Sequence, residues 1–227
     1  MIINQNDHLF STDKALELFV FLFLIVPSMI LSLFLTQGSA SNFKILAIST
    51  IIRDLGLLFL VLYFVWKNGE SFYSIGWNFR RPGDEIILGA FLFFPTSIFI
   101  SIIQTILQNN GLPIPEHASG MFHRSGHFEL ILAIIMVIVV AVVEETVFRG
   151  YLILRFRQIT SNVSMSVIFS TVVFAMGHGY EGAAGIILVF ILGVIFAVIY
   201  IWRKSLLAPM TMHFLQDFLG IVVFYGK

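Results

Sequence analysis

The sequence contains no cysteine and few charged residues, which make up 11% of its 227 positions. Without cysteine, disulfide bonds and thiolate catalysis are excluded. A soluble domain has about a quarter of its residues charged, so this chain lacks the polar residues that a water-facing surface requires. Hydrophobic residues make up 58% of the chain, and 25 residues are phenylalanine. The composition therefore predicts a protein whose solvent is the lipid bilayer.

Neither sign of charge is in excess, because 13 basic residues balance 13 acidic ones. Net charge therefore gives no reason to expect nucleic acid as a partner. The partners that we expect are the lipid bilayer and a peptide or protein substrate at the membrane, and the oligomeric state is left open.

The apolar runs are long and do not alternate with polar residues, which argues against the strands of a barrel. Only helices and closed barrels satisfy the backbone inside a bilayer. We therefore expect an all-α fold, a polytopic transmembrane bundle of about seven to eight helices with an intramembrane polar cavity. About 20 mainly apolar residues make one span, which places spans near 15–36, 43–66, 86–108, 128–157, 163–178, 183–202 and 206–225.

No linker or repeat divides the chain, so we expect one integral membrane domain, 1–227, with the motif-bearing part at about 128–225. Seven spans would put eight basic residues on one side of the membrane and three on the other. The eight are Lys14, Lys67, Arg80, Arg81, Arg155, Arg157, Arg203 and Lys204. Basic loops stay in the cytoplasm, so the N-terminus is predicted to be cytoplasmic; in a bacterium the membrane would be the cell membrane.

Two glutamates interrupt the fourth apolar run, where an ionisable side chain normally faces a bundle interior or a wet cavity. Glu145 and Arg149 are four residues apart on one helix face and can form an ion pair. Glu144 points about 100° away, on a face with Phe148 and Tyr151, and can serve as a general base. The alternative is a helix that ends before the pair and leaves both acids among the lipid headgroups.

Two later apolar segments each carry a histidine. His178 ends the fifth segment, and helical counting puts it roughly as deep as Glu144, at about 20 to 24 Å from the turn between their helices. His213 and Asp217 are four apart on one face of the seventh segment, although His213 counts as shallower. A structural His–Asp pair is the alternative interpretation. Arg53 and Asp54 in the second segment are interpreted as structural residues that need partners on other helices.

At these residues the chain resembles the CAAX-protease and bacteriocin-processing family, also called the Abi family, and its type II CAAX prenyl proteases. The family's first motif is a Glu-Glu pair separated by three residues from Arg, matched by Glu144, Glu145 and Arg149. Its second motif is Phe with His four residues later, matched by Phe174 and His178. Its third is His followed at four by Asn or a similar residue, matched by His213 and Asp217. The motifs occur in the family's order.

The resemblance implies an intramembrane endopeptidase, acting on prenylated CAAX proteins in eukaryotic relatives and linked to peptide maturation and bacteriocin immunity in bacterial ones. Glu144 and His178 would activate the attacking water, and Arg149 would hold Glu145 and its helix. His213 and Asp217 would stabilise the oxyanion. The family commonly has Asn at the last position. An ionised Asp217 would repel an oxyanion, so it could instead orient His213.

Two chemistries and one non-enzymatic function fit these residues. Glu144 can be a general base helped by His178 without a metal, which we favour slightly. Alternatively Glu144, His178 and His213 bind a divalent ion such as zinc, as one carboxylate and two imidazoles leave a position for water. The non-enzymatic alternative is a membrane immunity factor or scaffold of the same fold.

Overall fold

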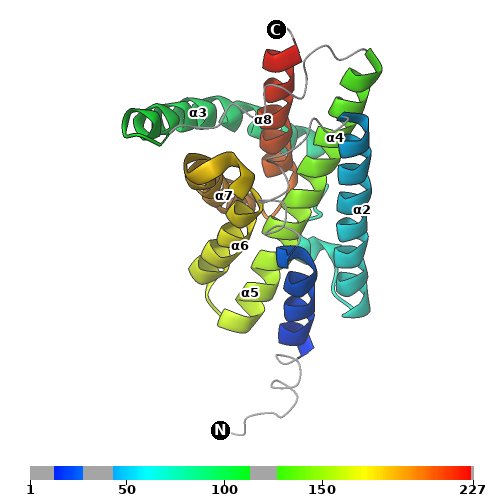
Figure 1. Cartoon of the computed structure of the whole chain (residues 1–227). Coiled ribbons are helices and arrows are strands. Elements are labelled where there is room, and N and C mark those ends of the chain that lie inside the picture. Colours follow the sequence, from blue (N-terminus) through cyan, green and yellow to red (C-terminus); the bar gives the residue numbers. More distant parts are fainter. Residues whose placement is uncertain (1–12, 28–42, 113–126, 226–227) are drawn as a thin grey trace, which may run out of the picture.

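The computed structural model describes residues 13–27, 43–112 and 127–225, and every regular element within these residues is helical. The long elements are α2 (Phe43–Lys67), α3 (Pro82–Asn109), α4 (His127–Glu144), α5 (Ile153–Thr160), α6 (Val163–Gly177), α7 (Gly182–Arg203) and α8 (Leu207–Tyr225). The short ones are η1 (Phe72–Ile75), η3 (Glu145–Leu152) and η4 (Gly179–Glu181). A helical segment also covers residues 13–27 (Figure 1, blue). The predicted all-α fold is confirmed.

Four of the described helices are long and apolar enough to cross a membrane: 43–67, 82–109, the continuous 127–160 and 179–203. The apolar helix α6 is shorter. These helices coincide with predicted spans and indicate an integral membrane protein. Large apolar side chains point outward from them, with Phe59 70% and Phe91 71% exposed, because lipid tails are as apolar as a protein core. The predicted end of the first span, 28–36, lies outside the described residues.

Local chemistry explains several helix ends. Asn162 begins α6, where its side chain accepts a hydrogen bond from the Met165 amide. Pro82 occupies the first position of α3, where its fixed φ suits a helix and its missing N–H costs nothing. Helices α5 and α7 end at Ser161 and Lys204, whose φ angles of 54° and 53° turn the chain out of the helix.

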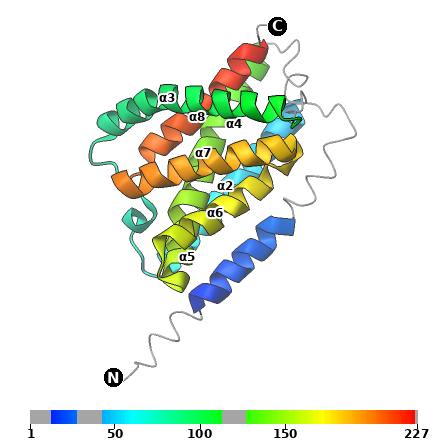
Figure 2. The same cartoon turned by 90° about the vertical axis from the view of Figure 1, so that its left-hand side faces the viewer.

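Helix α4 and its continuation occupy the middle of the bundle. In Figure 1, α2, α4 and α8 run side by side, while α3 and α7 cross them at a steep angle, as Figure 2 also shows. Helix α4 packs against α2 and α8, and η3 packs against α6, α7 and η1. Any polar residue on the buried faces of α4 and η3 is thereby surrounded by helices.

A polar network joins helix ends at one side of the molecule. The Arg155 side chain, 0% exposed, donates to Glu17 at 2.8 Å and to Glu70 at 2.7 Å. Glu70 also pairs with Lys14 at 3.1 Å, and Tyr151 donates to Glu17 at 2.7 Å. The helix ends that carry Lys14, Lys67 and Arg155 are thus held together. Which side of the membrane they face stays a prediction.

Candidate active site

The helix that contains the Glu-Glu pair changes its winding immediately after Glu144. Residues Glu145–Leu152 form a π-helix, η3, in which all eight residues are buried. Gly150 packs here against the Ile75 carbonyl, which a β-carbon would approach to 2.5 Å. The Ser170 hydroxyl from α6 donates to the Phe148 carbonyl at 2.5 Å. Neighbouring segments therefore hold the wider turn, and such turns are frequent at functional sites.

Glu145 connects Arg149 and His213 in the site. Its side chain is 0% exposed, and its Oε1 accepts a hydrogen bond from Arg149 Nη1 at 2.9 Å. The predicted ion pair is therefore present. The same oxygen lies 2.8 Å from His213 Nδ1. A carboxylate oxygen accepts, so this imidazole nitrogen carries the proton and donates. The contact with His213 was not predicted, since 68 residues separate the two.

The second nitrogen of His213 faces two further carboxylates. Its Nε2 lies 3.8 Å from Glu144 Oε2 and 3.6 Å from Asp217 Oδ2. Both distances exceed a hydrogen bond and fall within ion-pair range. The Glu144 side chain is 19% exposed and that of Asp217 is 32% exposed, against 8% for His213. The predicted shared face of His213 and Asp217 is confirmed, and this side of the cluster is its more open side.

His178 approaches the cluster through an aromatic contact. It caps the C-terminus of α6, and its Nδ1–H donates to the Phe174 carbonyl at 3.0 Å. Its ring centroid lies 4.7 Å from that of Phe174, which lies 6.3 Å from the ring of His213. Between His178 and Glu144, both described, the structure has no hydrogen bond or ion pair. His178 also interacts electrostatically with Glu181 and Asp217.

Aromatic rings enclose the buried arginine. Phe174 lies 4.1 Å from the Arg149 guanidinium carbon and Phe196 lies 5.4 Å from it. Phe148 packs edge-on against Phe174 at 4.9 Å. Phe174, the phenylalanine of the second motif, therefore contacts both Arg149 and Phe148. Gly193 of α7 makes room, since a β-carbon there would meet Thr171 at 2.6 Å and Arg149 Nη2 at 3.4 Å. Arg149 is thereby confined to the side of Glu145.

The face that was predicted for Glu144 is only partly correct. Phe148 does line the site, but Tyr151 turns away and donates to Glu17 in the polar network. Ordinary α-helical spacing would have aligned all three residues. The π-helix has a wider turn, so successive side chains rotate less and Tyr151 falls on another face.

Asp54 on α2 lies near the site, and the sequence did not indicate this closeness to Glu144. Its carboxylate is 2% exposed and lies 2.8 Å from the guanidinium of its neighbour Arg53. The expectation that these two residues need partners on other helices is therefore wrong, because the long arginine side chain folds back along its own helix. Asp54 is close enough to Glu144 for their charges to interact. A buried acid in a transmembrane segment was the available signal.

Zinc was predicted as one possible cofactor, with Glu144, His178 and His213 as ligands. Among the described residues, no three His, Asp or Glu side chains are grouped closely enough to hold a metal ion. His178 makes its close contact with the Phe174 ring, at 4.7 Å between centroids, whereas His213 and Glu144 face each other at 3.8 Å. In this arrangement the three side chains do not fit a metal centre.

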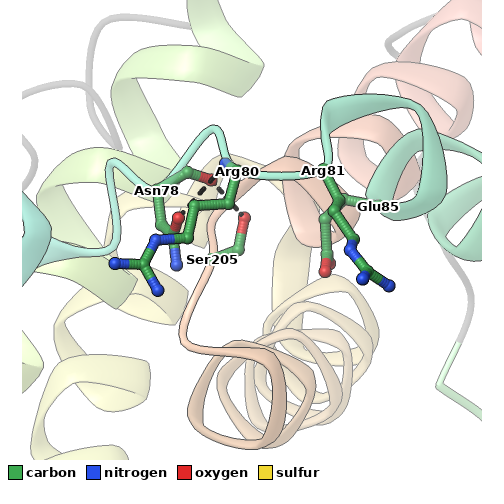
Figure 3. A pocket seen from close by; sticks show the side chains of 5 residues that line it. All are labelled: Asn78, Arg80, Arg81, Glu85 and Ser205. Atoms are coloured by element: carbon green, nitrogen blue, oxygen red, sulfur yellow. Dashed lines mark hydrogen bonds between the residues drawn. The ribbon is translucent and has the colours of Figure 1, made fainter.

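A cavity of about 200 Å³ lies elsewhere, lined by Asn78, Arg80, Arg81, Glu85 and Ser205 (Figure 3). None of the catalytic candidates lines it. The polar cavity that was predicted within the bilayer therefore stays a prediction, while the buried polar cluster around His213 is observed.

Comparison with known proteins identifies one family. The model of the family described as "Type II CAAX prenyl endopeptidase Rce1-like" matches residues 126–219. This segment includes all three motifs and the elements from α4 into α8. No curated protein and no solved structure matches the chain. The description names a peptidase, so a protease family is indicated, but it mentions neither a metal nor bacteriocin immunity. The resemblance in the motifs is confirmed over residues 126–219, which match the model of the type II CAAX prenyl endopeptidase Rce1-like family.

Proposed function

We propose that the chain is an intramembrane endopeptidase that hydrolyses a peptide bond of a membrane-associated peptide with a water molecule activated by Glu144 and His178. The substrate would be a prenylated CAAX-like C-terminus or a leader peptide. The observation that carries the proposal is the buried cluster in which Glu144, Glu145 and Asp217 surround His213. The family match at 126–219 supports the same class of reaction.

Glu144 is the general base. Its Oε2 is buried and has no hydrogen-bond partner among the described residues, so it is available to a water molecule. Glu144 accepts a proton from water while the hydroxide oxygen bonds to the scissile carbonyl carbon. When the tetrahedral intermediate collapses, the C–N bond breaks and Glu144 returns the proton to the leaving nitrogen.

His213 stabilises the oxyanion. Its Nδ1–H is committed to Glu145, which fixes the ring and leaves Nε2 facing the space beside Glu144. A protonated Nε2 donates to the developing oxyanion. Such donors contribute roughly 3 to 4 kcal/mol to a transition state when preorganised. Arg149 keeps Glu145 in place and adds a buried positive charge.

Asp217 replaces the family's usual Asn. We assign it to orienting His213, since its Oδ2 lies 3.6 Å from Nε2. His178 completes water activation with its free Nε2, because its Nδ1–H is bonded to the Phe174 carbonyl. His178 would have to move closer to Glu144 when substrate binds, and catalytic contacts often tighten only in the complex.

The function is tested by cleavage of prenylated CAAX peptides by the purified wild type and its Glu144→Gln variant. We expect the variant to lose at least about a hundredfold in kcat, since general base catalysis supplies 10²–10⁴-fold, while its melting temperature stays near that of the wild type. A variant that cleaves at the wild-type rate would contradict the assignment of Glu144.

A chelator added to the wild type distinguishes the two chemistries. Unchanged cleavage supports the metal-free reaction, and loss that zinc restores supports the metal alternative. We also propose that the N-terminus is cytoplasmic; because the chain has no cysteine, labelling of single-cysteine variants from either side of a vesicle would test this directly.

A further inference from the structure

The cavity in Figure 3 takes no part in the proposed hydrolysis, because none of the catalytic candidates lines it. It lies where the chain passes from η1 into α3 and where α7 turns into α8, and its volume is about 200 Å³. The turn is closely tied together: Ser205 donates to the Asn78 carbonyl at 3.2 Å, and the Leu206 amide donates to the Gly76 carbonyl at 3.0 Å. The walls are therefore part of the folded structure and not of a loose loop.

The acidic wall of this cavity is paired with a cation, whereas the basic residues at its rim are largely unpaired among the described residues. Glu85, its acidic wall, is already paired with Arg203 through contacts of 2.6, 3.1 and 3.3 Å. The Arg80 guanidinium makes no hydrogen bond or ion pair with the described residues, and Figure 3 shows it extended away from Arg81. Arg81 is 81% exposed and has one long contact of 3.9 Å to Asp84. Positive charge at the rim is thus left uncompensated.

Further hydrogen-bond donors point to an anion. The Asn78 carboxamide oxygen accepts from the Arg80 amide, so its NH₂ group remains as a donor. Helix α3 begins here without a capping side chain, and the first N–H groups of a helix have no partner within it. The Arg80 guanidinium, the Asn78 carboxamide and these amides are donors of the kind that bind phosphate oxygens. Arg81, which Figure 3 shows extended to the other side, adds positive charge at the rim.

The position of the cavity indicates that the anion belongs to a membrane lipid. It lies at the ends of two helices that are apolar enough to cross a membrane, and lipid phosphates lie just outside the hydrocarbon layer. The segments that line it also carry large exposed apolar side chains, with Phe79 56%, Trp202 62% and Ile87 70% exposed. The Trp202 ring also lies 5.1 Å from the Arg203 guanidinium carbon. An aromatic at the interface beside a cation is typical of contact with headgroups.

We propose that this cavity binds the phosphate headgroup of an anionic membrane lipid, with Arg80 holding the phosphate, Arg81 adding positive charge at the rim, and exposed apolar side chains of the adjoining segments contacting the acyl chains. Basic pockets between transmembrane helices bind anionic headgroups in this way. The proposal does not depend on proteolysis.

The test is native mass spectrometry of the full chain in detergent, titrated with phosphatidylglycerol, phosphatidylcholine or inorganic phosphate. The variant Arg80→Gln/Arg81→Gln removes two charges from the cavity. The matched control, Lys67→Gln/Arg157→Gln, removes two exposed charges from other helix ends. We expect wild type to prefer phosphatidylglycerol and the cavity variant to bind it about 25-fold more weakly, as each basic residue near an anionic surface contributes about fivefold. The control should bind like wild type.

Several results would overturn the proposal. Equal losses in both variants would mean a general effect of surface charge. Equal binding of the two lipids would mean that acyl chains alone are recognised, and displacement of the lipid by millimolar inorganic phosphate would identify a free anion as the ligand. The single variant Arg80→Gln guards against misfolding, because the Arg80 guanidinium has no hydrogen bond or ion pair with the described residues to lose; wild-type affinity in this variant would also contradict the assignment.

Discussion

Arg149 is the side chain whose burial is hardest to account for by itself. It is 1% exposed, and a buried charge costs several kcal/mol unless it is paired. Glu145 supplies the partner, and the rings of Phe174 and Phe196 cover the guanidinium faces. One nitrogen, Nη2, still has no hydrogen-bond partner among the described residues. The arginine therefore depends on tight packing by all the residues around it.

Gly193 is the residue where this packing can be tested. In Gly193→Ala the new methyl group would collide with Thr171, in the wall beside Arg149. Overpacking of this kind costs about 1–3 kcal/mol, so we expect a lower melting temperature and reduced cleavage. The control is Gly56→Ala, since a β-carbon at Gly56 has nothing within 4 Å. Equal melting temperatures for the two variants would show that the site tolerates the displacement.

The π-helix is the element on which the site depends. It follows Glu144 directly, places Glu145 against His213 of α8 and holds Arg149 beside Glu145. Three neighbours hold it: Gly150 packs on Ile75, Ser170 donates to the Phe148 carbonyl, and Trp77 donates to Thr146 at 3.1 Å. Because these contacts come from η1, from Trp77 just after it and from α6, the winding is determined by tertiary structure.

Removal of one of these contacts should affect catalysis more than folding. Ser170→Ala loses the hydrogen bond to the Phe148 carbonyl, and we expect a loss of about 1 kcal/mol in stability with a clearly lower kcat. Ser49→Ala is the control, because its hydroxyl bonds only to the Leu46 carbonyl of its own helix. If both variants cleave equally well, the contact from α6 is not needed to hold the π-helix.

Helix positions could be predicted from the sequence, whereas the winding of η3 could not. Continuous apolar runs determine where helices lie in a bilayer, and the Glu145–Arg149 pair follows from a spacing of four. The bond from His213 to Glu145 joins α8 to η3, and no local pattern encodes it. The turn of Tyr151 toward Glu17 was missed for a related reason, since Ile75, which packs against Gly150 in the π-helix, is distant in the sequence.

At the scale of the whole molecule, the network around Arg155 joins the segment 13–27 to α5 and to the turn after α2. Burial alone would raise the pKa of Glu70, but hydrogen bonds from Gln158 and Arg155 outweigh it and hold this pKa below its ordinary value of 4.5. The folded state therefore gains stability from Glu70 that is complete above the ordinary pKa and is lost as the pH falls through the lowered one.

We expect the melting temperature of the purified protein to decrease between about pH 7 and pH 3 as this carboxylate is protonated. The variant Glu70→Gln should be less stable at neutral pH and should change less over the same range, so that its difference from wild type narrows in acid. Circular dichroism melts of the two proteins measure this difference. A constant difference at every pH would mean that the charge of Glu70 is not what stabilises the helix ends.

The wide turn at η3 also has a consequence for how the chain tolerates insertions and deletions. A regular helix from 127 to 160 would link the rotation of α4 rigidly to that of α5, at about 100° per residue. The π-helix contains the equivalent of one added residue, and its wider turn takes up that residue locally while α4 faces α2 and α8 and α5 faces α6. Deleting one residue from 145–152 would let the segment return to regular winding with both halves close to their present faces, whereas the side chains inside it, Glu145 and Arg149 among them, would change direction. A change of length in this segment would therefore disturb the site before it disturbs the bundle.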